Sequence, residues 1–95
     1  MYIFTLKFDL HKHLATLSKR QTIGFVPTMG VLHEGHLELI NQSKRKCTTT
    51  ICSIFVNPTQ FNSTKDLANY PKTLKADLEQ LEQLGCDIVY TPTVA

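Results

Sequence analysis

Apolar residues follow two different spacings along this chain, and together they predict strands that alternate with helices. Short runs of apolar and β-branched residues predict buried strands, and they occupy 2–4, 22–26, 49–56 and 87–90. The segments between these runs favour helices, with apolar residues three or four positions apart on one face. The predicted helices are 9–20, 35–46 and 72–84.

The order of these elements predicts an α/β fold. A strand, a helix and a second strand over this length imply a right-handed crossover and a parallel sheet. Asp9 is the expected N-cap of the first helix, and Gly85 is the expected left-handed C-cap of the last. The polar segment 62–71 is expected to be irregular. The layout β-α-β-α-β corresponds to an incomplete half of a doubly wound domain.

One stretch, 22–40, combines a strand, a turn and a helix start in the way that α/β proteins build anion sites. Pro27 is expected to end the strand, because it has no N–H to donate. Gly30 can make the turn, since it tolerates backbone angles and close approaches that a Cβ forbids. The free N–H groups of the following helix would then face an anionic group.

Two histidines flank a glycine at this helix start. If the helix begins near Gly35, His36 lies in its first turn and His33 just before it. Both imidazoles can then donate hydrogen bonds to phosphate oxygens, and a planar base can lie on the bare backbone of Gly35. A zinc site is disfavoured because H-E-G-H is one residue shorter than H-E-x-x-H and lacks an obvious third ligand. A plain alternative is that both histidines are polar loop residues beside a helix.

Two turn-rich loops should line one crevice. In doubly wound sheets, ligands bind beyond the carboxyl ends of the strands. Segments 27–35 and 57–62 both leave such ends. This placement joins the two histidines and Gln60 into one candidate site.

Composition narrows the class of protein. The chain has 95 residues, enough for one small domain, and a net charge of +2, too small to indicate a nucleic-acid partner. Three cysteines without a C-x-x-C pair favour buried thiols in a reducing compartment. No run approaches the roughly 20 apolar residues that span a membrane, and the amino terminus lacks the long apolar stretch of a signal peptide. We therefore expect a cytoplasmic protein with no membrane partner and no metal ligands of its own.

Three sequence blocks resemble those of one enzyme family. PTMGVLHEGHLELI, SIFVNPTQF and DLANYPKT are similar, in the same order and at similar spacing, to blocks of the pantothenate synthetases, also called pantoate–β-alanine ligases. That family belongs to the nucleotidyltransferases with an H-x-G-H signature and a Rossmann-like fold. The similarity extends over about 22–92.

The resemblance implies an ATP-dependent condensation of (R)-pantoate with β-alanine. Pantoate would attack the α-phosphate of ATP to give pantoyl adenylate and pyrophosphate, and β-alanine would then displace AMP. ATP with Mg²⁺ would be required, and full-length members are commonly homodimers. The substrates follow from the resemblance alone.

The resemblance also assigns roles to individual residues. His36 would be the proton donor and His33 its companion on the phosphates, and Gln60, with Met29 and Phe61, would hold pantoate and β-alanine. The residues that would bind ATP are Pro27, Thr28, Met29, Gly30, Val31, Leu32, His33, Glu34, Gly35 and His36.

Departures from the family pattern leave alternatives open. Val31 replaces a common alanine, and the G-E-K-D block, a second pantoate glutamine and a serine–arginine loop do not occur. Residues 1–95 therefore correspond to the N-terminal part of a Rossmann-like nucleotide-binding domain, with the C-terminal domain absent. One alternative is a truncated, non-catalytic nucleotide-binding remnant, which we expect to self-associate through its uncovered apolar surface. Another is a different H-x-G-H nucleotidyltransferase.

Overall fold

The computed structural model describes residues 1–56 and 64–92, with the backbone alone for 64–70. Strands and helices alternate along this part of the chain, as the sequence predicts. In chain order they are β1 (Tyr2–Phe4), α1 (Lys7–Leu14), β2 (Ile23–Thr28), α2 (Glu34–Lys46), β3 (Thr49–Ile54), α3 (Thr64–Leu84) and β4 (Ile88–Tyr90).

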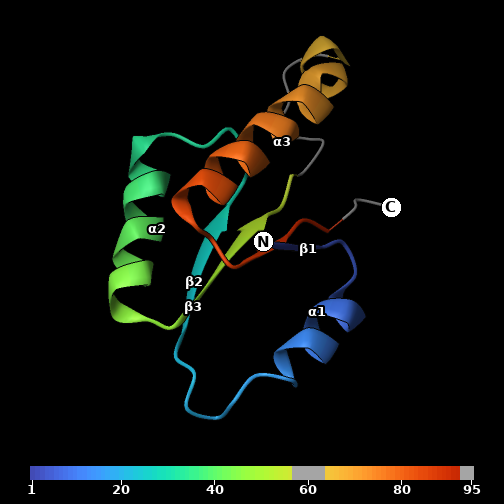
Figure 1. Ribbon diagram of the computed structural model, residues 1–95. Helices are drawn as coiled ribbons and strands as arrows, with labels where there is room; N and C mark the ends of the chain where they lie inside the picture. The colour runs from blue at the N-terminus through green and yellow to red at the C-terminus, as the bar shows by residue number, and fades with distance from the viewer. Residues whose placement is uncertain (57–63, 93–95) are drawn as a thin grey trace.

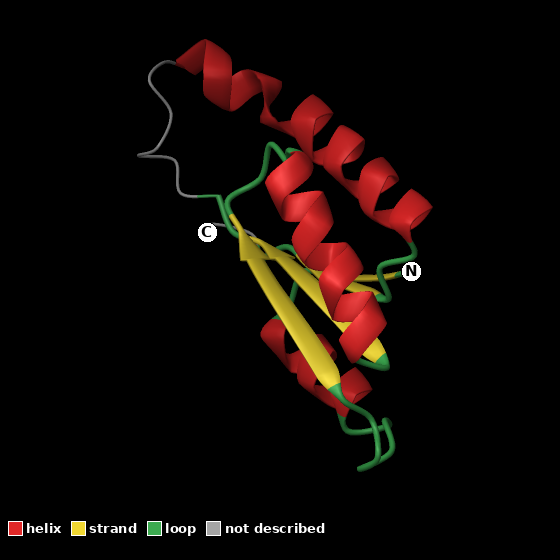
Figure 2. Cartoon of the chain, turned by 90° about the vertical axis from the view of Figure 1, so that its left-hand side faces the viewer, coloured by secondary structure: helices red, strands yellow, loops and turns green. Residues whose placement is uncertain are grey.

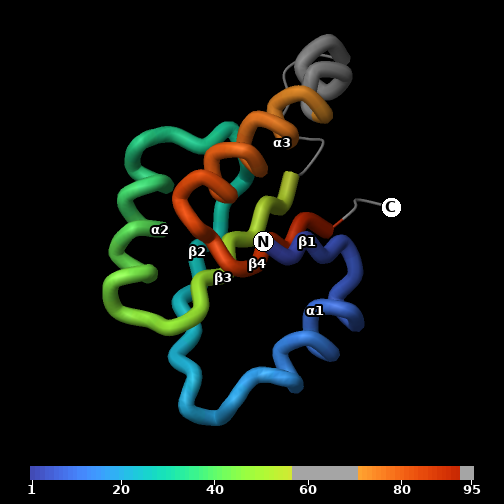
Figure 3. Tube along the Cα trace, viewed as in Figure 1, coloured from blue at the N-terminus to red at the C-terminus, as the bar shows by residue number. Residues whose placement is uncertain are grey.

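The strands form one parallel sheet in the order β1-β4-β3-β2 (Figure 1). The first strand therefore lies beside the last, although the two are far apart in the sequence (Figure 3). β2 and β3 are paired along their whole length, with Thr28 opposite Ile54. Their carboxyl ends consequently lie side by side, and the loop after β2 starts next to the end of β3.

Helices cover both faces of the sheet, which confirms the predicted Rossmann-like α/β architecture (Figure 2). α2 and α3 pack on one face around Ile40, Leu81 and Val89, and α1 packs on the other through Leu10. β3 is buried along its whole length because both faces are covered. Burial from both sides explains why its uncharged, largely β-branched sequence does not alternate between apolar residues and charged ones.

The prediction that Pro27 ends the first core strand is wrong. Pro27 lies inside β2, opposite Ser53 of β3. In the described part of the chain β2 has a partner on one side only. An edge strand tolerates proline because the missing N–H then faces away from the ladder.

Two predicted helix boundaries also differ from the structure. α1 begins at Lys7, with Leu6 rather than Asp9 as N-cap, and it stops at Leu14, six residues early. It stops there because the hydroxyl and the N–H of Thr16 both donate to the carbonyl of His13, a local alternative to helix.

The third helix is longer than its sequence indicates. α3 begins at Thr64, so the irregular segment predicted for 62–71 is wrong from residue 64 onward, and Pro71 lies inside the helix. A proline removes one helical hydrogen bond and costs about 3 kcal/mol. Downstream packing of Leu74, Leu78 and Leu81 against the core offsets that cost.

The end of α3 is predicted correctly. Gly85 has a φ of 82°, its N–H donates to Glu82, and the N–H of Cys86 donates to Leu81, as in a Schellman motif. The Lys44 ammonium on α2 also donates to the carbonyl of Leu84. A cation on the last carbonyls of a helix suits its dipole.

Two of the three thiols are buried and one is more accessible. Cys52 and Cys86 are buried, and Cys47 is half-buried. Burial, and then the neighbouring Cys86, raise the pKa of Cys52 to about 12, and burial also raises the pKa of Cys86. The expectation of buried thiols is confirmed for these two. In the described part of the chain, no helix is both long and apolar enough to cross a membrane.

We predict that one thiol per folded chain reacts readily with iodoacetamide at pH 8. The thiolate is the nucleophile, so raised pKa values and burial protect Cys52 and Cys86. Mass spectrometry should find the label on Cys47, and Cys47→Ser should remove the fast phase. Unfolding in urea should release the other two. Fast labelling of Cys52 in the folded chain would contradict this assignment.

Candidate functional site

The loop after β2 is held against the end of β3 by Thr28. Its hydroxyl donates to the carbonyl of Ser53 at 3.0 Å and accepts the N–H of Gly30 at 3.3 Å. A Cβ on Gly30 would lie 3.5 Å from side-chain atoms of both Ile54 and Val56. This loop therefore lies against the end of β3; the second predicted loop, 57–62, lies outside the described residues.

This loop turns through two consecutive residues with left-handed backbone angles. Gly30 has a φ of 87° and Val31 a φ of 54°. For a β-branched residue such as valine this region is a true outlier, and strain of this kind persists only where the surroundings enforce it. Two hydrogen bonds do so: Asp77 accepts the N–H of Val31 at Oδ2 and the N–H of Leu32 at Oδ1, each at 2.9 Å.

Our sequence reasoning missed Asp77. Its side chain is only 3% exposed, although it is a carboxylate on a helix. A signal was present, because Asp77 lies three residues after Leu74 and four before Leu81, on the apolar face of the predicted helix. A charge at a core-facing position needs a partner inside the protein, and that requirement could have identified it.

His33 and His36 together cap the amino end of α2. His33 is the N-cap residue, and its Nδ1 accepts the N–H of Gly35 at 3.1 Å. In return, Nδ1 of His36 accepts the N–H of His33 at 3.3 Å. The two rings lie with centroids 4.1 Å apart. The predicted placement, with His36 in the first turn and His33 just before it, is confirmed.

This cap fixes the protonation pattern of both rings. A neutral imidazole that accepts at Nδ1 carries its proton on Nε2. Each histidine therefore keeps an Nε2–H group for a further acceptor, while its other nitrogen satisfies a backbone donor of the helix start. The resting arrangement offers two neutral donors beside the positive end of a helix dipole.

Gly35 makes room for the His33 ring. A Cβ at this position would lie 2.9 Å from Cε1 and 3.2 Å from Nδ1 of His33. The bare backbone that we expected to receive a planar base is therefore occupied by the imidazole. Any base that uses this surface must displace the His33 ring first.

The charge state of His36 follows from its neighbours. Burial lowers the pKa of His36 below its ordinary value of 6.5, and the nearby His33 lowers it further, whereas the Asp77 carboxylate raises it. Among the described residues, His33 at the N-cap of α2 and Asp77 from α3 are the titratable groups that act on it. At neutral pH the ring is therefore uncharged.

The other predicted ATP-site residues line the same loop in different environments. The side chains of Pro27, Met29, Val31 and Glu34 are exposed. Leu32 is half-buried and packs against the core. Gln60 and Phe61 lie outside the described residues.

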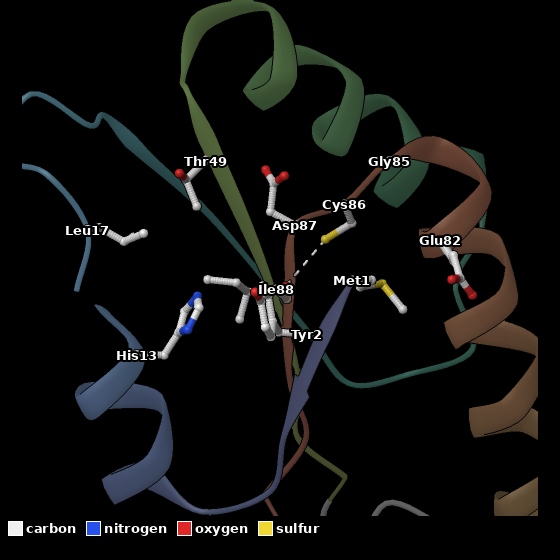
Figure 4. A pocket seen from close by; sticks show the side chains of 10 residues that line it. All are labelled: Met1, Tyr2, His13, Leu17, Thr49, Glu82, Gly85, Cys86, Asp87 and Ile88. Carbon is white, nitrogen blue, oxygen red and sulfur yellow. Dashed lines mark hydrogen bonds between the residues drawn. The ribbon is translucent and has the colours of Figure 1, made fainter. Parts of the chain in front are cut away.

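The described residues contain no group of three or more histidine, cysteine, aspartate or glutamate side chains that could hold a metal ion. A cavity of about 380 Å³ is present elsewhere, lined in part by His13, Thr49, Glu82 and Asp87 (Figure 4). Because Thr49 begins β3, this cavity lies at the amino ends of the strands. It is thus at the opposite end of the sheet from the histidines.

His13 beside this cavity packs against the aromatic side chains of β1. It is half-buried, and its ring centroid lies 4.3 Å from that of Tyr2 and 5.3 Å from that of Phe4. These contacts give it a packing role on β1. His11, two residues earlier on α1, is exposed.

Curated proteins similar to this chain are pantothenate synthetases. The proteins of Leptospira biflexa and Acinetobacter baumannii are each 55% identical over 75 residues, which is 79% of this chain. The chain spans only 26% and 27% of their respective lengths.

Solved structures give the same relationship in three dimensions. The pantoate-beta-alanine ligase of Francisella tularensis, complexed with Beta-gamma ATP and Beta-alanine, is 44% identical with a TM-score of 0.80 over 97% of this chain and 35% of that one. Pantothenate synthetase of Thermus thermophilus is 36% identical with a TM-score of 0.74, over 98% of this chain and 32% of that one. The family model described as pantoate-beta-alanine ligase matches residues 3–95, and the chain therefore belongs to this family.

Proposed function

We propose that this chain provides the nucleotide-phosphate side of an ATP-dependent ligase that joins pantoate to β-alanine. The observation that carries the proposal is the paired cap of α2, in which His33 and His36 each use Nδ1 internally and keep an Nε2–H donor. Phosphate oxygens are the acceptors that suit two such donors at a helix start. Membership of the ligase family supplies the substrate class.

The histidines would act on the pyrophosphate that leaves ATP. In the first step the pantoate carboxylate attacks the α-phosphorus, the bond to the bridging oxygen breaks, and pyrophosphate departs. Negative charge grows on the β- and γ-phosphates during this step. Donors already aimed at that charge stabilise the transition state more than the ground state.

A change in the protonation of His36 fits the same step. Phosphates near the ring would raise its pKa, because an opposite charge favours the protonated form. A second proton on Nδ1 would end its acceptance of the His33 N–H, so the cap must open as the ring becomes charged. His36 would then be a proton donor to the departing pyrophosphate.

The second step would need the residues beyond β3. The amine of β-alanine attacks the acyl carbonyl of pantoyl adenylate, and AMP leaves with the bonding electrons. Met29 is exposed on the loop, and it and Phe61 would form the wall of the substrate pocket. Gln60 would form hydrogen bonds with pantoate and β-alanine. Mg²⁺ would accompany ATP by neutralising its phosphates. The full-length protein would be a homodimer, would act in the cytoplasm and would bind no nucleic acid.

We predict pantoate-dependent exchange of labelled pyrophosphate into ATP, and we expect His36→Ala to reduce it roughly 10²- to 10³-fold. Loss of one oxyanion-stabilising donor typically has this effect. The exchange should be measured on the 95-residue chain and on the intact Francisella tularensis relative. His11→Ala is the matched control, because His11 is an exposed histidine on α1.

The outcomes separate the competing functions. Exchange within a few-fold of wild type in His36→Ala would contradict the role of His36. A folded chain that binds ATP without exchange, beside an active relative, would favour the non-catalytic alternative. Exchange that does not require pantoate would contradict the proposed substrate.

We also predict that acid destabilises the fold partly through His36. The unfolded chain binds a proton at this residue near pH 6.5, whereas the folded chain binds it only at lower pH. Between these two pKa values the unfolded state holds more protons, so the free energy of unfolding falls as the pH falls through this window. The contribution is complete above pH 6.5.

Urea unfolding between pH 5 and pH 8 measures this effect. His36→Gln should flatten the pH dependence, and His11→Gln should leave it unchanged. An unchanged slope in His36→Gln would show that other groups cause the acid sensitivity.

A further inference from the structure

Asp77 is buried, and no cationic side chain among the described residues forms an ion pair with it. Asp77 is 3% exposed on the core-facing side of α3, and the ion pair identified within the described residues joins Arg45 to Glu38 at the surface instead. Both Asp77 oxygens accept main-chain N–H groups, one from Val31 and one from Leu32. Such charge-assisted bonds are roughly twice as strong as neutral ones. Both oxygens of the carboxylate therefore bind the loop after β2.

These bonds act where the backbone is most strained. Val31 is held at a φ of 54°, next to Gly30 at 87°. The two peptide groups that follow Gly30 and Val31 are those whose N–H groups Asp77 binds. Without these acceptors, the backbone of Val31 would relax toward a negative φ, which valine favours. That relaxation would redirect the chain immediately before His33.

We propose that Asp77 is a positioning residue for the nucleotide site: by holding the Val31 and Leu32 amides, it fixes the turn that brings the His33 and His36 imidazoles together at the start of α2. The inference rests on the proposed function for its catalytic meaning, but its structural content does not require activity. Asp77 itself makes no contact with substrate in this mechanism. It acts through the turn and through its charge.

The charge of Asp77 adds a second effect on the same ring. Burial and His33 disfavour a proton on His36, and Asp77 opposes both. A carboxylate in this position keeps the pKa of His36 closer to its ordinary value, so that the ring takes up a proton more readily. A residue that merely anchored α3 to the loop would not need to influence the titration of His36.

The test is an NMR titration of the histidine rings in the 95-residue chain from pH 5 to pH 8. Asp77→Asn keeps the shape but removes the charge and one acceptor. We expect the pKa of His36 to fall below its wild-type value, and the ¹⁵N shifts of both Nδ1 atoms to show loss of the paired cap. Asp77→Glu keeps the charge and should retain more of the wild-type pKa than Asp77→Asn does.

Asp87→Asn is the matched control. Its carboxylate also accepts a backbone N–H, from Thr50 at 2.8 Å, but at the amino end of β4. The titration of His36 should be unchanged in this variant. Unaltered His36 titration and Nδ1 shifts in a folded Asp77→Asn chain would overturn the proposal and leave Asp77 as a helix anchor.

A wild-type measurement keeps the proposal testable if Asp77→Asn does not fold. NMR couplings across the hydrogen bonds should join the amide nitrogens of Val31 and Leu32 to the carboxyl carbon of Asp77. Rapid solvent exchange of both amide protons in the folded chain, without such couplings, would overturn it. ATP binding, followed on the same samples, tests the proposed function separately: failure of the wild-type chain to bind ATP would remove the catalytic meaning while the ring titrations still decide the role of Asp77.

Discussion

The unsatisfied N–H groups at the amino end of α2 are the constraint around which the site is built. A helix start needs acceptors, and short oxygen-bearing side chains usually supply them. In this chain two imidazoles do so: His33 accepts the N–H of Gly35, and His36 accepts the N–H of His33. The choice has a chemical consequence, because an imidazole that caps through one nitrogen still presents a donor at the other. Stabilising the helix and preparing an anion site are then one arrangement.

That arrangement depends on contacts from three elements. β2 and β3 end together, and Thr28 ties the loop to Ser53. α3 then supplies Asp77, whose two bonds enforce left-handed angles that valine disfavours. The strain in the turn is local, but the groups that maintain it come from sequence positions about 45 residues away. The site therefore requires the sheet and both helices of one face to be folded.

The features that could be predicted from the sequence are those that neighbouring residues determine. The β3 run and the Gly85 cap show their structure in adjacent residues, and the histidine spacing placed His36 in the first turn of its helix. Prediction failed where tertiary context decides. Pro27 is compatible with β2 because that strand lies at an edge of the sheet that the described residues form, and Pro71 lies within a helix that core packing stabilises. Asp77 was missed because its partners are backbone amides, which the residue types do not reveal; only its core-facing position indicated that it needed a partner.

The same geometry explains why the resting site is neutral although its proposed chemistry needs charge. Burial and the neighbouring ring keep His36 unprotonated, and the unprotonated Nδ1 is what the helix cap requires. An arriving polyphosphate would favour the protonated ring and could replace the imidazoles as acceptor for the N–H groups of the helix start. Ligand and cap thus compete for the same donors. Binding would release the histidines at the moment when their protons become useful, and the turn fixed by Asp77 would keep them beside the phosphates while they change partners.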